Sequence, residues 1–247
     1  MRRPTPWLFL LLFLLASPLS LPAAESVPAP GQPIDFTRLL PPPPAPGSVA
    51  DREDKAVVRA WQERRTPEME ALAQADAART AQPFLPALGR DLAPEKLPLT
   101  MAFFETLRKD ADAMLGEAKA HWNRPRPPQA DPDIRPSLRL PHNASYPSGH
   151  STYATAAAVM LAGMVPERAA EIYDRAEAYR LSRIIGGVHY PSDIAAGRIA
   201  GTVIAATLLE NAAFVEGMCA AGVELRQSLG LAPRPCPGPG IAAKPAN

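Results

Sequence analysis

The chain has 247 residues and a formal net charge of +1 at pH 7, with 26 Lys and Arg against 25 Asp and Glu. This balance gives no electrostatic reason for nucleic acid or an anionic membrane surface as a partner, so we expect no nucleic-acid binding. The length allows one domain with a sizeable hydrophobic core.

Residues 1–24 have the layout of a secretory signal peptide. Two arginines precede an apolar run over residues 7–15, and small residues follow at Ala23-Ala24. The run is short for a membrane span, which needs about 20 residues. An uncleaved N-terminal anchor is the alternative. Cleavage predicts a periplasmic or secreted protein with a net charge of −1 and no stable membrane span.

Proline marks the expected boundaries of the chain. Residues 25–47 include Pro41 to Pro44 and predict an extended N-terminal arm, and residues 231–247 predict a proline-rich C-terminal tail. Residues 125–141 predict a long loop of the kind that often serves a function. The domain that carries the activity is then expected to span residues 48–230.

The chain has two cysteines, Cys219 and Cys236. In an exported protein a disulfide between them would tie the tail to the last helix, and two unpaired thiols are the alternative. They do not predict a zinc site, because two cysteines with no histidine nearby cannot fill four coordination positions.

The apolar spacing between the proline-rich segments is helical. Helices are predicted after Ser48, from Pro67, from Thr100 to Lys119, from Gly149 to Ala162, from Pro166 to Ile185, from Pro191 to Leu209 and from Asn211 to Leu229. Strand signals are essentially absent. We therefore predict an all-α, single-domain helical bundle with the active site at helix ends and loops.

One predicted helix is apolar enough to raise the question of a membrane span. The stretch 194–214 is interrupted by Arg198 and Glu210, while Gly197 and Gly201 favour close packing against another helix. We interpret it as a buried core helix.

Three short blocks supply the residues for a chemical reaction. They are Lys119-x6-Arg126-Pro127, Pro147-Ser148-Gly149-His150 and Ser182-Arg183-x5-His189-x3-Asp193. Together they provide three cations, two histidines, a hydroxyl, a glycine turn and a carboxylate four residues after the second histidine. That set can hold a phosphoryl group and attack it with an imidazole.

The predicted helices place these groups at helix ends. Ser148 and Gly149 stand at a helix start, where free amide groups and the helix dipole favour an anion. Lys119, Arg126 and Arg183 would neutralise that anion if they converge on it.

The two histidines need different roles. Asp193 lies one helical turn after His189, so it can accept a hydrogen bond from one ring nitrogen and leave the other free to attack phosphorus. His150 lies at the helix start beside the expected phosphate, where it can protonate the departing oxygen.

The stretch Ala144 to Ser151, which reads ASYPSGHS, resembles the bacterial class A nonspecific acid phosphatases, as does the Leu40-Pro41-Pro42-Pro43-Pro44 arm. These enzymes belong to the phosphatidic acid phosphatase type 2 superfamily, which also contains membrane lipid phosphatases and vanadium haloperoxidases. The resemblance covers residues 39–225 and is specific in the motif blocks.

The resemblance implies a role for each motif residue. His189 would be the nucleophile that forms a phosphohistidine, Asp193 would orient it, and His150 would be the acid. Phosphate would be bound by Lys119, Arg126, Ser148, Gly149 and Arg183. No metal or other cofactor is implied, and vanadate is expected as an inhibitor.

Two departures from the class A pattern leave the natural substrate open. Gly186-Gly187 stands where class A members usually carry a cysteine, and His189-Tyr190 replaces their His-Trp. Neither change touches a catalytic group.

We predict an exported acid phosphatase that acts on small phosphomonoesters, with a broad range and phosphate transfer to alcohols; the oligomeric state is left open. A lipid phosphate phosphatase at the membrane surface is the alternative. A vanadium haloperoxidase would be much longer, and a helical binding or scaffold protein would leave the paired histidines unexplained.

Overall fold

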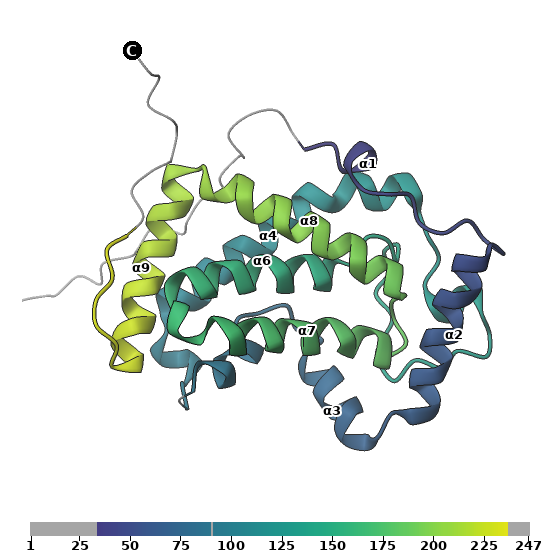
Figure 1. The fold of residues 1–247 in the computed structure, drawn as a ribbon, viewed down its shortest axis with the longest axis horizontal. Helices are drawn as coiled ribbons and strands as arrows, with labels where there is room; N and C mark the ends of the chain where they lie inside the picture. Colours follow the sequence, from purple (N-terminus) through teal and green to yellow (C-terminus); the bar gives the residue numbers. More distant parts are fainter. Residues whose placement is uncertain (1–33, 90, 237–247) are drawn as a thin grey trace, which may run out of the picture.

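The structure is a computed structural model that describes residues 34–89 and 91–236 (Figure 1). The predicted signal peptide and the end of the predicted tail lie outside these residues. Within the part of the chain that the structure describes there is no strand, and the predicted all-α fold is confirmed.

The helices follow the predicted order. The longer ones are α2 (Val49–Arg64), α4 (Pro98–Trp122), α6 (Gly149–Met164), α7 (Ala169–Ile185), α8 (Pro191–Leu209) and α9 (Ala212–Leu229). The shorter ones are α1 (Phe36–Leu39), α3 (Pro67–Ala75), α5 (Pro127–Ala130), η1 (Gln82–Leu88), η2 (Pro94–Lys96) and η3 (Pro166–Arg168). Several boundaries differ from the prediction. Helix α4 runs from Pro98 to Trp122, α6 continues to Met164, and Pro166 opens a separate 3-10 turn before α7. The predicted loop 125–141 contains the one-turn helix α5.

Local chemistry explains several of these boundaries. The Ser48 side chain accepts a hydrogen bond from the amide of Asp51 and caps α2. Helix α7 ends at Ile185 because two glycines follow it, and Gly187 takes a φ of +71°, which side-chain-bearing residues rarely adopt.

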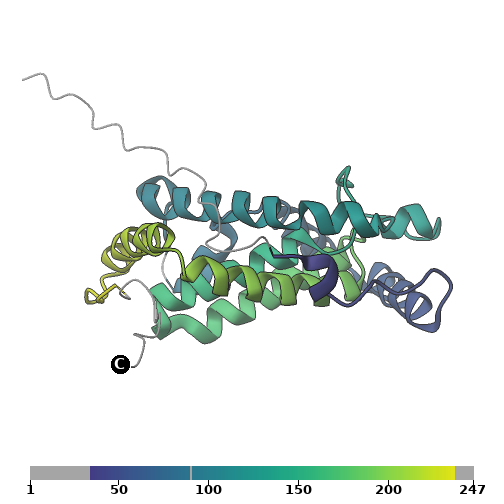
Figure 2. The ribbon, with the colours of Figure 1, turned by 90° about the horizontal axis from the view of Figure 1, so that it is seen from above.

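Helix α6 occupies the centre of the bundle. It contacts α4 on one side and α7 and α8 on the other (Figure 2). Helix α8 lies close to α6 because it presents glycines there: a Cβ on Gly201 would lie 2.4 Å from the carbonyl oxygen of Thr152. Helix α8 is long and apolar enough to cross a membrane by length and composition, and half of its apolar window is buried in the bundle.

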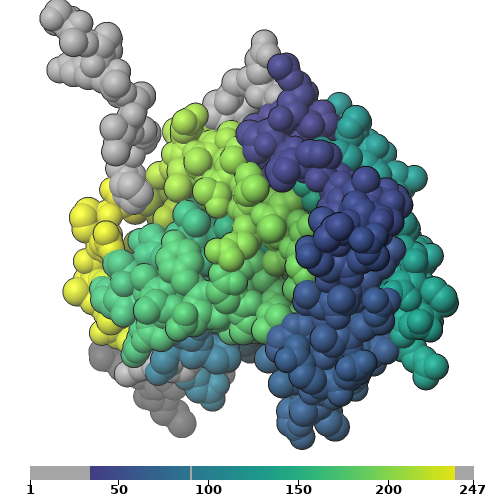
Figure 3. Space-filling view, turned by 45° about the vertical axis from the view of Figure 1, so that its right-hand side comes forward, coloured from purple at the N-terminus to yellow at the C-terminus, as the bar shows by residue number. Residues whose placement is uncertain are grey.

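Helices α2 and α3 cover one end of the bundle beside α7 and α8 (Figure 3). The described part of the predicted N-terminal arm is more than an extended chain, because it begins with the one-turn helix α1. Phe36 and Leu40 are buried, and the Tyr146 hydroxyl donates a hydrogen bond to the Pro41 carbonyl. Burial of these two apolar side chains stabilises the packed position of the arm relative to an exposed one.

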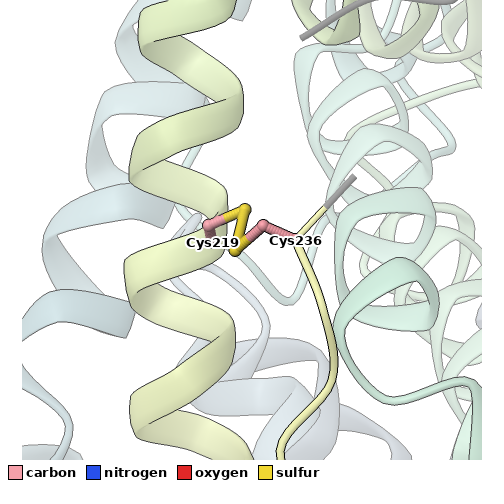
Figure 4. Close-up of a disulfide and its surroundings, with 2 residues drawn as sticks. All are labelled: Cys219 and Cys236. Atoms are coloured by element: carbon pink, nitrogen blue, oxygen red, sulfur yellow. A yellow bond between two sulfur atoms is a disulfide. The ribbon is translucent and has the colours of Figure 1, made fainter. Parts of the chain in front are cut away.

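A disulfide joins Cys219 of α9 to Cys236, the last residue of the chain that the structure describes (Figure 4). The two Cα atoms are 5.4 Å apart, and the bridge closes a separation of 17 residues. Of the two alternatives for these cysteines, the structure has the bridged one, and it holds residues 231–236 along α9.

Candidate active site

His189 and Asp193 form a buried pair at the start of α8. Asp193 lies in the first turn of α8, and its Oδ2 atom is 3.2 Å from Nδ1 of His189 in the preceding loop. Ser145 donates to the same carboxylate oxygen, and the amide of Tyr190 does so at 2.9 Å. These contacts fix the direction of the imidazole ring.

The surroundings of His189 define its tautomer. Nη1 of Arg126 lies 3.1 Å from Nε2 of His189. A guanidinium only donates hydrogen bonds, so Nε2 must accept, and the proton of a neutral ring then sits on Nδ1, where Asp193 accepts it. Burial lowers the pKa of His189, which keeps this ring neutral. The lone pair of Nε2 accepts from Arg126 in this structure, and it becomes free to attack when that guanidinium turns to another acceptor.

Arg124 is a site residue that the sequence analysis missed. Its guanidinium is buried and donates to Oδ1 of Asp193 at 2.7 Å and to Asp54 of α2 at 2.8 Å. It also lies over the ring of Tyr190, 4.0 Å from the centroid. Burial opposes ionisation of Asp193, but the hydrogen bond from His189 and the charge of Arg124 outweigh it and hold the pKa of that carboxyl below its ordinary value.

Two sequence signals could have revealed this network. Arg124 lies inside the first motif block, two residues before Arg126. Asp51 and Asp54 share a face of α2 with the buried Val58, and a carboxylate on an apolar helix face requires a partner.

The start of α6 supplies backbone donors. Ser148 caps the helix by accepting from the Ser151 amide at 3.3 Å, and its own amide donates to the Asp193 carbonyl at 3.1 Å. This second bond ties α6 to α8. Gly149 and His150 lie in the first turn, where amide groups have no acceptor within the helix. The position therefore suits an anion.

Lys119, near the end of α4, reaches the start of α6. Its Nζ atom donates to the carbonyls of Pro147 at 2.7 Å and Ala144 at 2.9 Å, and a Cβ on Gly149 would lie 3.9 Å from its Cε. Burial, and then the charge of Arg126, lowers the pKa of Lys119 to about 7. An anion bound here would favour the charged form.

Arg183 and His150 are held by a part of the chain that no motif includes. This 73–79 segment comprises the end of α3 and the turn after it. The Ala73 carbonyl accepts from the buried guanidinium of Arg183, and the Ala77 carbonyl accepts from Nε2 of His150 at 3.0 Å. A carbonyl cannot donate, so Nε2 of His150 carries a proton and Nδ1 is the atom left for proton transfer.

The two histidines lie on facing sides of one small region, with ring centroids 6.5 Å apart. Burial, and then the nearby charge of Arg183, lowers the pKa of His150 well below its ordinary value. The structure thus brings together the residues of all three motif blocks. Their catalytic and phosphate-binding roles stay predictions.

Comparison with known proteins supports the family. Residues 99–213 match the model of the PAP2 superfamily. The chain is 31% identical to the non-specific acid phosphatase of Salmonella typhi over 91% of this chain and 93% of that protein. It is 33% identical to the acid phosphatase of Zymomonas mobilis over 76% of this chain and 75% of that protein.

A shorter match covers 30% of this chain and 39% of the decaprenylphosphoryl-5-phosphoribose phosphatase of Mycolicibacterium smegmatis, at 43% identity. The family model and the two acid phosphatases together show that the chain belongs to the PAP2 superfamily. The resemblance to its nonspecific acid phosphatases is confirmed.

Proposed function

We propose that this protein is an exported acid phosphatase that hydrolyses phosphomonoesters through a phosphohistidine on His189. The observation that carries the proposal is the state of the His189 ring. Its Nδ1–H faces Asp193, and its Nε2 lone pair faces Arg126, one of the cations expected to bind phosphate. Membership of the PAP2 superfamily and the acid phosphatase names of the relatives support the same activity.

The first chemical step transfers the phosphoryl group to the enzyme. The Nε2 lone pair of His189 forms a bond to phosphorus while the bond from phosphorus to the ester oxygen breaks. For this step His150 must be the imidazolium, with Nε2–H on the Ala77 carbonyl and a second proton on Nδ1, a form that the bound phosphate dianion favours. The ester oxygen takes the Nδ1 proton, so the alcohol leaves neutral and His150 is left as the neutral ring. The Asp193 carboxylate stabilises the positive charge that develops on the His189 ring.

The second step returns the enzyme to its starting state. A water molecule attacks the phosphohistidine, and His150 takes one proton from it. The bond between phosphorus and Nε2 breaks, and His189 leaves as the neutral imidazole. An alcohol in place of water would give phosphate transfer, which we propose as a side activity.

Charge neutralisation comes from side chains and amides in this scheme. Arg126 would turn its guanidinium from Nε2 of His189 and from the protein carbonyls to the phosphoryl oxygens. Arg183 would keep its bond to the Ala73 carbonyl and donate from Nη1. Lys119 and the first-turn amides of α6 would complete the shell. Because these groups address only the phosphoryl part, we expect little discrimination between leaving groups.

The test is phosphate release from a chromogenic monoester, combined with labelling by radioactive substrate and a quench in alkaline denaturant, in which the bond between phosphorus and nitrogen survives. His189→Ala should abolish both turnover and label, since no neighbouring group replaces the nucleophile. His150→Ala should slow esters of poor leaving groups more than esters of good ones. His142→Ala, at an exposed loop position, is the matched control and should match the wild type. A labelled His189→Ala protein would show that the nucleophile is elsewhere.

A lipid phosphate phosphatase is the second candidate, favoured by the match to an enzyme of a lipid-linked sugar phosphate. A panel of nucleotides, sugar phosphates, aryl phosphates and a short-chain phosphatidate separates the two. A preference for the lipid above about a hundredfold, or about 2.7 kcal/mol in transition-state binding, would favour this candidate.

Export is supported by the signal-peptide pattern of residues 1–24 and by the disulfide, which forms in oxidising compartments. Fractionation of cells that produce the full chain tests it. Recovery of the full-length protein in the cytoplasm would contradict it.

A further inference from the structure

Arg79 lies at the entrance to the candidate phosphate site, although no motif contains it. It belongs to the 73–79 segment, outside the residues that match the family model. A Cβ placed on Gly149 would lie 3.1 Å from Nη1 of Arg79, closer than the 3.9 Å to Cε of Lys119. The Arg79 guanidinium therefore faces the first residue of α6, where the phosphoryl group is expected.

Arg79 is held in this position by a carboxylate that has another partner. Both of its terminal nitrogens donate to Asp112 of α4, with Nη2 at 2.8 Å from Oδ2. Arg108 also donates to that oxygen at 3.0 Å. If Arg79 turned part of its hydrogen bonding to a ligand, Asp112 would still accept from Arg108, whose guanidinium also pairs with Glu105. The side chain of Arg79 remains 23% exposed, so solutes can reach it.

The cations gathered around the start of α6 favour an anion near Arg79. Arg79 is among the charges that lower the pKa values of Lys119 and His150, after burial and after the larger effect of Arg126 on Lys119 and of Arg183 on His150. The cations repel one another where no ligand separates them. An anion placed among them would relieve that repulsion.

We propose that Arg79 is a further phosphate-binding residue, which donates to the phosphoryl group beside Gly149 while Arg108 stays hydrogen-bonded to Asp112. The inference rests on the proposed function and adds a fourth cation to the three from the motif blocks. Because the 73–79 segment also holds Arg183 and His150 through backbone carbonyls, ligand contact at Arg79 would fix the segment that positions both.

The test measures binding of inorganic phosphate by calorimetry, and inhibition of turnover by the same anion, for three variants of the full chain. Arg79→Gln should weaken phosphate binding by about tenfold to a hundredfold, the effect of losing a charge-assisted hydrogen bond. Arg79→Lys should recover part of the loss, because it keeps the charge without the planar fork.

Arg108→Gln is the matched control. It removes a cation from the same carboxylate, and from Glu105 as well, but Arg108 is not among the side chains next to Gly149. Phosphate binding should therefore change less than about twofold. Thermal unfolding without phosphate checks that each variant is folded. If Arg79→Gln is unfolded, the comparison is made between Arg79→Lys and Arg108→Gln. Weaker phosphate binding by Arg79→Lys supports the proposal, and weaker phosphate binding by Arg108→Gln overturns it.

The outcomes separate this inference from the proposed function. Suppose that the wild type binds phosphate and turns over normally. If Arg79→Gln then has no effect, or the same effect as Arg108→Gln, only the role of Arg79 is overturned. A wild-type protein that neither binds phosphate nor hydrolyses monoesters overturns the proposed function, and this inference with it.

Discussion

Lys119 should set the alkaline limit of activity toward esters of good leaving groups, which need little proton donation from His150. Burial lowers its pKa to about 7 in the free protein, and the neutral amine cannot balance the charge of a phosphoryl group. The sign is therefore a loss of activity as pH rises. With a pKa of about 7, the charged fraction falls by about tenfold between pH 6 and pH 8, and by about tenfold again by pH 9.

The observable is kcat/KM, which reports ionisations of the free enzyme. It should follow that charged fraction, whereas kcat at saturation should fall less because bound phosphate favours the ammonium. Substitution of Lys119 by arginine replaces the amine with a group that stays charged at these pH values. We expect Lys119→Arg to be slower overall, because the two cations differ in shape, but to lose the descent between pH 7 and pH 9.

The assay is the pH dependence of kcat/KM for one chromogenic monoester from pH 4 to pH 10. Ionisation of the ester itself is the same for every variant, so a difference between two profiles reports ionisation of the enzyme alone. Lys109→Arg, on the exposed face of α4, is the matched control and should retain the wild-type profile. A wild-type profile that is flat from pH 6 to pH 9, or an unchanged descent in Lys119→Arg, would refute the reasoning.

Three further outcomes are expected. Arg124→Met leaves Asp193 and Asp54 buried without their shared cation, so urea unfolding should show a loss of about 3–5 kcal/mol, and an unchanged midpoint would contradict the network. Gly201→Ala, whose Cβ meets a carbonyl oxygen of α6, should lose about 1–3 kcal/mol, whereas Gly116→Ala in an open part of α4 should gain about 0.5–1 kcal/mol; the opposite order would be inconsistent with this packing. A chelator should leave activity intact and vanadate should inhibit tightly, so recovery by zinc or magnesium after chelation would replace this scheme with a metal-assisted one.

Much of the fold followed from local rules. Capping by Ser48, proline at the start of α8 and the glycine pair after α7 define helix ends through contacts a few residues apart. Such contacts depend only on residues that are close in the sequence, which is why the helix order was predictable. The predicted close approach of α8 was readable for a similar reason, since glycines at 197 and 201 leave room for a neighbour.

The proximity of His189 and Asp193 was equally local, because four residues span one turn at the start of α8. Their tautomer was not, since it depends on Arg126, which is 63 residues away in the chain. The lowered pKa of Lys119 also required the structure, because burial is a property of the packed bundle and not of the residue type.

The sequence by itself determined an all-α chain and predicted three blocks of residues suited to phosphate chemistry, since residue types and short spacings decide helices and local pairs. Only the tertiary structure decided which distant groups support those blocks. The carbonyls of the 73–79 segment that hold Arg183 and His150 leave no sequence signal, because every residue has a carbonyl. The bridge from Asp54 through Arg124 to Asp193 likewise depends on tertiary structure. Packing removes all three side chains from water, and unpaired charges would be costly in the protein interior.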